Sequence, residues 1–144
     1  MSAYLLDTHV LIWLARCPER IPGATRALLA DPSVTRFVSA VSAMEITTKY
    51  RLGKMPDGEP FVDNWEWALG ELMATQTPLT AAQGFAAGAL DWEHRDPFDR
   101  MLAAQAMDLG VPLVSGDAVM RTLPSLTICW SEHTSGAIKA LDED

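Results

Sequence analysis

Four acidic residues in four separate segments of the chain have the chemistry and the placement to bind a metal ion: Asp7, Glu45, Asp99 and Asp117. Two like charges about 5 Å apart repel each other by roughly 3 kcal/mol at an effective dielectric constant of about 20. Several such pairs would cancel much of the net stability of a domain, which is about 5–15 kcal/mol. If the four carboxylates meet, some of them must be protonated or a cation must lie among them.

The donor atoms of this set indicate which cation and which chemistry to expect. Carboxylate oxygens without a nearby pair of imidazoles or thiolates favour Mg²⁺ or Mn²⁺ over Zn²⁺. Such an ion polarises a phosphodiester and activates a bound water molecule, and a second ion can stabilise the leaving oxygen. The set therefore predicts metal-dependent hydrolysis of a phosphodiester.

Two of the acids follow predicted strands. An apolar run predicts a buried strand over residues 3–6, which ends at Asp7, and a second strand over residues 111–114 shortly precedes Asp117. In parallel α/β sheets, sites form beyond the carboxyl ends of the strands. We therefore expect both carboxylates at the same edge of a sheet.

The other two acids lie in the first turns of predicted helices. One helix is expected over residues 43–52, capped by Ser42, and it holds Glu45. The other is expected over residues 97–109 and holds Asp99. Helices that follow parallel strands begin at the carboxyl edge of the sheet, so all four acids are expected at one rim.

The remaining pattern predicts the fold class. Further elements are expected as helices over 8–15, 22–29, 61–74 and 80–90, strands over 36–39, 76–79 and 126–129, and a short helix after Asp117. Strands that alternate with helices predict an α/β fold with a mainly parallel sheet of four to five short strands and helices on both faces. Residues 1–130 are expected to form this domain, and residues 131–144 an acidic, flexible tail outside its core.

Composition limits the class of protein further. The chain has 144 residues, of which 49% are apolar and 21% charged, as is typical of one globular domain. A net charge of −8 excludes a strongly basic nucleic-acid binder but leaves room for a local basic patch. Cys17 and Cys129 lack zinc-ligand spacing and are expected to be reduced thiols. The apolar run over residues 10–15 is too short to span a bilayer, so a cytoplasmic protein is expected.

Three of the acids also have a structural interpretation. Asp99 can interact with the positive end of a helix that Asp96 caps. Glu45 and Lys49 have the spacing of a surface ion pair, and Asp117 can cap the short helix after it. The acid that ends the first strand has no such explanation, because a carboxylate between two apolar runs is costly to bury without a partner.

Four short stretches of sequence carry a family resemblance, in the order and at the spacing typical of that family. They are Leu5-Leu6-Asp7-Thr8-His9, Ser42-Ala43-Met44-Glu45-Ile46 with Lys49 and Gly53-Lys54, His94-Arg95-Asp96-Pro97-Phe98-Asp99-Arg100 with Ala103-Ala104-Gln105-Ala106, and Val114-Ser115-Gly116-Asp117. Over roughly residues 3–130 the chain resembles a PIN-domain ribonuclease of the VapC type, the toxin of bacterial type II toxin–antitoxin pairs. The resemblance implies a PIN-like three-layer α/β/α sandwich.

The resemblance also implies an acidic metal and catalytic site, carried over here to the same four acids, with Asp7 and Asp99 as the most direct ligands. Thr8 and Ser115 match positions where a hydroxyl orients water or a carboxylate. Asp96 is interpreted as a helix cap that stands close to the site.

A Mg²⁺-dependent endoribonuclease is the activity implied, with Mn²⁺ as an alternative ion and RNA as the substrate. The partners implied are a cognate VapB-like antitoxin that blocks the site and supplies DNA binding, and a second copy of the chain in a homodimer. No membrane partner is expected. Candidate phosphate contacts are the basic residues near the acids, which could equally be solvated side chains: Lys49, Arg51, Lys54, Arg95 and Arg100.

Two other classes of function stay open at this point. A non-catalytic module could use the acids to bind a basic partner segment. A phosphoryl-transfer domain also places Asp at strand ends, but a phosphatase would want a second Asp where His9 stands. Aromatic residues and His94 are interpreted as structural, although His94 could serve as a base and four tryptophans could stack on bases: Trp13, Trp65, Trp67 and Trp92.

Overall fold

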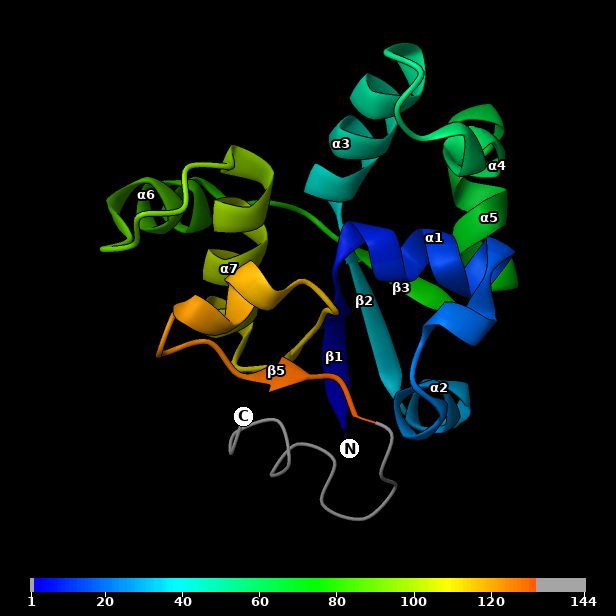
Figure 1. Ribbon diagram of the computed structural model, residues 1–144, viewed down its shortest axis with the longest axis horizontal. Helices are drawn as coiled ribbons and strands as arrows, with labels where there is room; N and C mark the ends of the chain where they lie inside the picture. The colour runs from blue at the N-terminus through cyan, green and yellow to red at the C-terminus, as the bar shows by residue number, and fades with distance from the viewer. Residues whose placement is uncertain (1, 132–144) are drawn as a thin grey trace.

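The apolar run near the start of the chain forms the central strand of a five-stranded sheet. A computed structural model describes residues 2–131, and Figure 1 shows the arrangement of its elements. Strand β1 (Ala3–Leu6) pairs with β2 (Thr35–Ser39) on one side and with β4 (Leu113–Val114) on the other. Strands β3 (Ala74–Thr77) and β5 (Ile128–Cys129) form the two edges, in the order β3-β2-β1-β4-β5. Every pair is parallel, as the alternating pattern predicts.

Helices cover both faces of this sheet. Right-handed crossovers place the helices that precede β3 on one face and those that follow it on the other. Figure 1 shows this division, with α1 and α2 across β1 from α6 and α7. The helices are α1 (Thr8–Arg16), α2 (Gly23–Ala30), α3 (Ala40–Arg51), α4 (Glu59–Asp63), α5 (Trp65–Glu71), α6 (Ala81–Ala89) and α7 (Pro97–Leu109), with 3-10 turns η1 (Pro18–Arg20), η2 (Pro56–Gly58) and η3 (Ala118–Thr122). The three-layer sandwich is therefore confirmed.

Local sequence signals set the ends of α6 and α7. Asp96 accepts hydrogen bonds from the backbone N–H groups of Phe98 and Asp99, and Pro97 occupies the first helical position. Gly110 ends α7 with φ +68°, a conformation that favours glycine. A capping box between Thr80 and Gln83 begins α6. These boundaries agree with the sequence prediction.

The start of α3 differs from the prediction. Ser39, not Ser42, caps the helix by accepting from the Val41 N–H, so the helix begins directly at the end of β2. Glu45 consequently lies in the second turn of α3 rather than the first. The hydroxyl of Ser42 is turned instead toward the hydroxyl of Thr8 on α1, 2.8 Å away.

Several further boundaries differ from the prediction. The helix expected over residues 61–74 is two helices, because Asn64 leaves the helical conformation (φ −156°, ψ 87°) and caps α5 by accepting from the Trp67 N–H. The strand expected over residues 76–79 begins earlier, at Ala74. Ser131, expected in the tail, is buried and pairs with Thr25 of α2. The rest of the predicted tail lies outside the described residues.

The core lies on both sides of β1. Leu5 and Leu6 are fully buried, and side chains from the helices on either face pack against them: Val10, Leu11, Ile46, Leu102 and Ala106 are among these. Within residues 2–131 no helix combines the length and the apolar character needed to cross a bilayer. The core thus fixes β1 rigidly, and with it the carboxylate that follows its last residue.

Candidate metal and nucleic-acid site

The chain changes direction across the sheet between β1 and β4. It leaves β1 toward β2 on one side and later enters β4 on the other side, which makes this pair of strands the topological switch point of the sheet. Ligand sites in open α/β sheets form at such points, outside the carboxyl ends of the strands. Asp7 follows β1 directly and Asp117 follows β4 by three residues, so both stand at this position.

Asp7 is the most enclosed of the four acids, with an exposed fraction of 3%. Its Oδ1 accepts from the Thr8 N–H at 2.7 Å, and its Oδ2 accepts from the Ser115 hydroxyl at 2.7 Å. Burial raises the pKa of Asp7 to about 6 despite these bonds, and the charges of Glu45 and Asp117 add to the rise. Within residues 2–131 no lysine or arginine side chain compensates this carboxylate, so it carries an unfavourable buried charge at neutral pH.

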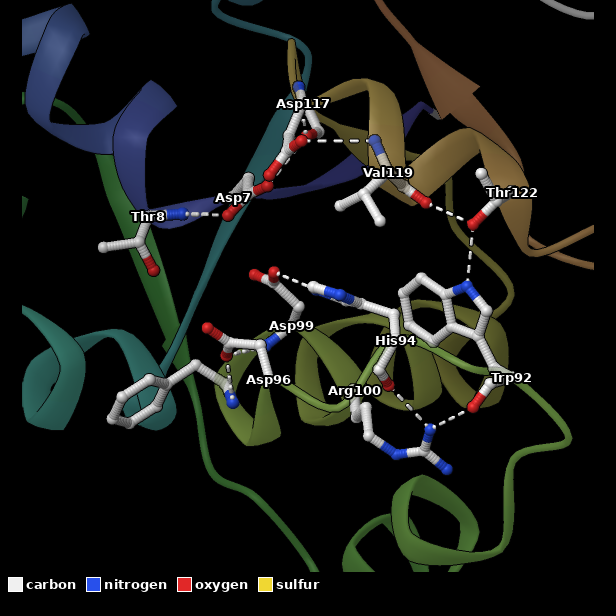
Figure 2. A network of polar contacts seen from close by, with 12 residues as sticks. Asp7, Thr8, Trp92, His94, Asp96, Asp99, Arg100, Asp117, Val119 and Thr122 are labelled. Atoms are coloured by element: carbon white, nitrogen blue, oxygen red, sulfur yellow. Dashed lines mark hydrogen bonds and ion pairs between the residues drawn. The ribbon is translucent and has the colours of Figure 1, made fainter.

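Asp99 faces the same space from α7, as Figure 2 shows. Its Oδ2 lies 2.7 Å from Nε2 of His94. Burial raises the pKa of Asp99 to about 6, the His94 hydrogen bond opposes this, and the charges of Asp7, Asp96 and Glu45 raise it further. The influence of the Asp7 charge on Asp99 shows that the two carboxylates lie within electrostatic reach of each other.

Glu45 supplies a third carboxylate, from α3, and is buried, with an exposed fraction of 5%. Its Oε2 lies 2.5 Å from Nζ of Lys49, one helical turn later. Its Oε1 is buried and has no hydrogen-bond partner among the residues that the structure describes. A buried carboxylate oxygen without a partner is rare in native proteins, and it marks a place where a ligand or cation would be stabilising.

Asp117 is exposed and completes the rim. Its Oδ1 accepts from the Val119 N–H, so it caps η3 as its structural interpretation predicts. Its backbone N–H donates to Oγ of Ser115, the same oxygen that donates to Asp7. The cap does not remove Asp117 from the site, because its charge also raises the pKa of Asp7.

The three residues expected to support the acids have different places. Ser115 contacts Asp7 through its hydroxyl. Thr8 contacts Asp7 only through its backbone N–H, while its hydroxyl bonds Ser42 and joins α1 to α3. Asp96 caps α7, and its charge acts on Asp99. All three therefore lie at the same edge as the four acids.

Two histidines belong to this site and were not predicted as part of it. His94, interpreted as structural, contacts Asp99 directly. His9 accepts from the Gly116 N–H through Nε2 at 3.1 Å, which leaves Nδ1 with the proton, 3.6 Å from Oδ2 of Asp7. Burial lowers the pKa of His9. The sequence could have indicated His9 as a site residue by its position, two residues after Asp7 in the first turn of a helix that begins at the same edge of the sheet.

The predicted phosphate contacts separate into two groups. Arg100 is already occupied within the protein, because its guanidinium uses all five N–H donors on backbone carbonyls, those of Ala87, Gly88, Leu90, Trp92 and His94. It fixes the segment that leads into α7, on the side of that helix away from the acids (Figure 2). Lys49 is paired with Glu45. Arg51, Lys54 and Arg95 are exposed.

The side chains that could hold a metal ion at this site are carboxylates. As placed, no three His, Cys, Asp or Glu side chains within residues 2–131 surround one common point closely enough to hold an ion. The pKa values of Asp7 and Asp99 are raised mainly by burial and in part by neighbouring carboxylates, and Oε1 of Glu45 has no partner within the described part of the chain, so the site holds carboxylate charge that is poorly solvated. The residues thus fit a hard divalent cation, provided that the side chains of Glu45 and Asp99 adjust.

Comparisons with known proteins bear on the fold and the family of the chain. No curated protein sequence matches the chain. Among solved structures, the chain resembles VapBC2 from Rickettsia felis, described as bound to a DNA fragment from their promoter, with a TM-score of 0.66 and 19% sequence identity over 90% of this chain and 99% of that one. The family model of the PIN domain matches residues 4–126, which include all four acids. The chain therefore belongs to the PIN domain family.

Proposed function

We propose that this protein is a metal-dependent endoribonuclease and acts as the toxin of a toxin–antitoxin pair. The observation that carries the proposal is that Asp7, Glu45 and Asp99, from three separate segments, lie within electrostatic reach of one another at one edge of a parallel sheet. Two of them have a pKa raised to about 6, and the third keeps a buried oxygen without a partner among residues 2–131. Such a set is costly for a fold alone and becomes favourable around a cation.

The ion we propose is Mg²⁺, with Mn²⁺ as a substitute, held by the oxygens of Asp7, Glu45, Asp99 and Asp117. When bound, it would polarise a phosphodiester and promote ionisation of a water molecule for attack on phosphorus. The chain's own part is to hold the ligands. Ser115 and the Thr8 N–H orient Asp7, and His94 orients Asp99.

RNA has to approach a chain of net charge −8. We propose that Arg51, Lys54 and Arg95 contact its phosphates, because all three are exposed and lie at or near an end of α3 or α7, the helices that carry Glu45 and Asp99. Phosphate contacts from lysine and arginine give affinity without sequence readout. These contacts therefore do not select among RNA sequences.

The proposed partners follow from the family and from the solved complex that the chain resembles. We propose a VapB-like antitoxin that covers the acidic site and supplies the DNA binding, and a homodimer of this chain as the toxin unit. Cys17 and Cys129 are both free thiols, which suits a reducing cytoplasm.

The test is cleavage of total RNA by the purified, antitoxin-free protein. Discrete fragments are expected with Mg²⁺, and none with EDTA or with Asp7→Asn or Asp99→Asn. Asp57→Asn, an exposed change away from the site, serves as the control and should cleave as wild type does. Absence of cleavage together with an unchanged melting temperature on addition of Mg²⁺ or Mn²⁺ would overturn the proposal and favour a non-catalytic module that binds a basic segment.

A further inference from the structure

Lys49 places a positive charge inside the acidic site. Its ammonium lies 2.5 Å from Oε2 of Glu45, and the Lys49 side chain keeps 35% of its surface exposed, against 6% for Glu45. Partial burial alone would lower the pKa of Lys49, but the hydrogen bond to Glu45 and the charges of Glu45, Asp96 and Asp99 raise it instead. One ammonium thus interacts with carboxylates from both α3 and α7.

The other carboxylates of the site have partners without a permanent charge. Asp7 accepts from a backbone N–H and a hydroxyl, and Asp117 accepts from a backbone N–H. Asp99 bonds an imidazole. Glu45 differs from them, because one of its oxygens contacts a full positive charge while the other is buried and has no partner among residues 2–131.

We infer that Lys49 is a built-in counter-ion of the metal site, which neutralises Glu45 in the metal-free protein and opposes the entry of a divalent cation. This inference rests on the metal site of the proposed function and reassigns Lys49 from a phosphate contact to the control of metal affinity. A divalent ion bound to Glu45 has to overcome repulsion from the ammonium or displace it. Lys49 therefore lowers the affinity for metal and stabilises the protein without it.

The ion pair between Glu45 and Lys49 should contribute more to stability than an exposed ion pair between residues four apart on a helix. Exposed pairs of that kind contribute little, because both groups are well solvated when apart. Here Glu45 is 5% exposed and cannot recover that solvation if Lys49 is removed. The metal-free protein therefore depends on Lys49 in a way that it does not depend on an exposed lysine such as Lys54.

The direct test is a Mn²⁺ titration of the full-length protein, with binding measured by calorimetry or by the spin-resonance signal of free Mn²⁺. Lys49→Gln is expected to bind Mn²⁺ on the order of tenfold more tightly, which is the effect of one positive charge about 6 Å from a divalent ion even at the dielectric constant of water. Lys49→Arg, which keeps the charge, and Lys54→Gln, which removes a nearby exposed charge, should stay within about twofold of wild type.

The outcomes separate this inference from the proposed function. Wild type that binds Mn²⁺, with unchanged or weaker binding by Lys49→Gln, overturns the counter-ion role and leaves the metal site standing. Absence of Mn²⁺ binding by wild type and by every variant overturns the metal site and this inference with it. If Lys49→Gln binds Mn²⁺ more tightly than wild type while Lys49→Arg and Lys54→Gln do not, the result supports both the metal site and the counter-ion role of Lys49.

A second measurement in EDTA tests the metal-free role. The urea midpoint of Lys49→Gln is expected to fall below that of Lys54→Gln, because Glu45 keeps a buried charge without its partner. Glu45→Gln combined with Lys49→Gln should recover part of this loss, since the uncompensated charge is then gone. A Lys49→Gln midpoint equal to that of wild type would contradict the inference whatever the metal titration shows.

Discussion

Ser115 joins two acids that lie more than one hundred residues apart in the sequence. Its hydroxyl donates to Oδ2 of Asp7 at 2.7 Å, across a separation of 108 residues, and accepts from the Asp117 N–H at 3.1 Å. A hydroxyl has one proton to give and lone pairs to accept, so both bonds form on the same oxygen. The end of β1 and the loop after β4 are thereby held at a fixed distance.

Loss of this hydroxyl should weaken metal binding more than folding. Ser115→Ala leaves the buried Oδ2 of Asp7 without its donor, which is expected to cost about 1–3 kcal/mol of the unfolding free energy. Outer partners of metal ligands change metal affinity by roughly tenfold or more, so the Mn²⁺ dissociation constant should rise by at least that factor. Urea denaturation and Mn²⁺ titration measure the two effects. Ser125→Ala, at an exposed serine, is the control. Unchanged Mn²⁺ affinity in Ser115→Ala would contradict the positioning role.

The raised pKa values predict an unusual dependence of stability on pH. Burial raises the pKa of Asp7 and of Asp99 to about 6, from an ordinary value of 3.8. The folded state therefore binds more protons than the unfolded state between these values, and the unfolding free energy must fall as the pH rises through that window. The stabilisation is fully present below about pH 4 and is lost above about pH 6.

The contribution of Asp7 can be isolated with Asp7→Asn. In EDTA, the urea midpoint of the variant is expected to rise relative to wild type as the pH increases from about 4 to 7, because only wild type then acquires the buried charge. The comparison at each pH cancels the titration of the exposed carboxylates. Mn²⁺ should stabilise wild type at neutral pH and leave Asp7→Asn almost unchanged. A difference between the two proteins that does not vary with pH would contradict the raised pKa.

Two arginines five residues apart should respond in opposite ways to replacement. Arg100→Met removes five hydrogen bonds to backbone carbonyls and should cost about 2–4 kcal/mol in urea denaturation. Arg95→Met, at an exposed side chain, should stay within about 0.5 kcal/mol of wild type. Only Arg95→Met is expected to weaken RNA binding, with the slope of log affinity against log salt reduced by roughly 1. Equal stability losses in the two variants would contradict this division.

The sequence predicted the sheet, and the places of Asp7 at a strand end and Asp99 at a helix start, because both depend on local signals. Strand ends and helix starts are visible in the apolar pattern and in caps such as Asp96 and Thr80. In a parallel sheet these positions share one edge, so Asp7 and Asp99 could be assigned to one site without knowledge of any contact.

What the sequence did not predict depends on the path of the chain in space. Arg95 and Arg100 look alike in sequence, and only the course of the segment between α6 and α7 brings five carbonyls to one of them. Ser39 and Ser42 are both residues that favour a helix N-cap. Ser39 is the cap in the structure, and the hydroxyl of Ser42 bonds that of Thr8 on another helix. His9 contacts Gly116, 107 residues later, which no local pattern encodes.

Gly116 has no room for a side chain, because the indole of Trp130 packs against it. An ideal Cβ at this position would lie 2.6 Å from Cζ2 and 2.8 Å from Cε2 of Trp130. Gly116→Ala must therefore move the indole or the loop that carries Asp117, at a cost of about 1–3 kcal/mol in the unfolding free energy. A shifted loop should also weaken Mn²⁺ binding.

A double-mutant cycle identifies the indole as the cause. Trp130→Phe removes the ring atoms that the new Cβ would meet, so Gly116→Ala should cost less in that background than in wild type. Gly84→Ala is the matched control, since no atom lies within 4 Å of the position of its Cβ in α6. Gly84→Ala should raise the unfolding free energy by about 0.4–1 kcal/mol, because alanine lowers the conformational entropy of the unfolded chain. If Gly116→Ala costs the same in the Trp130→Phe background as in wild type, the indole is not what restrains the Asp117 loop, and the hydrogen bonds of that loop to His9 and Ser115 must hold it instead.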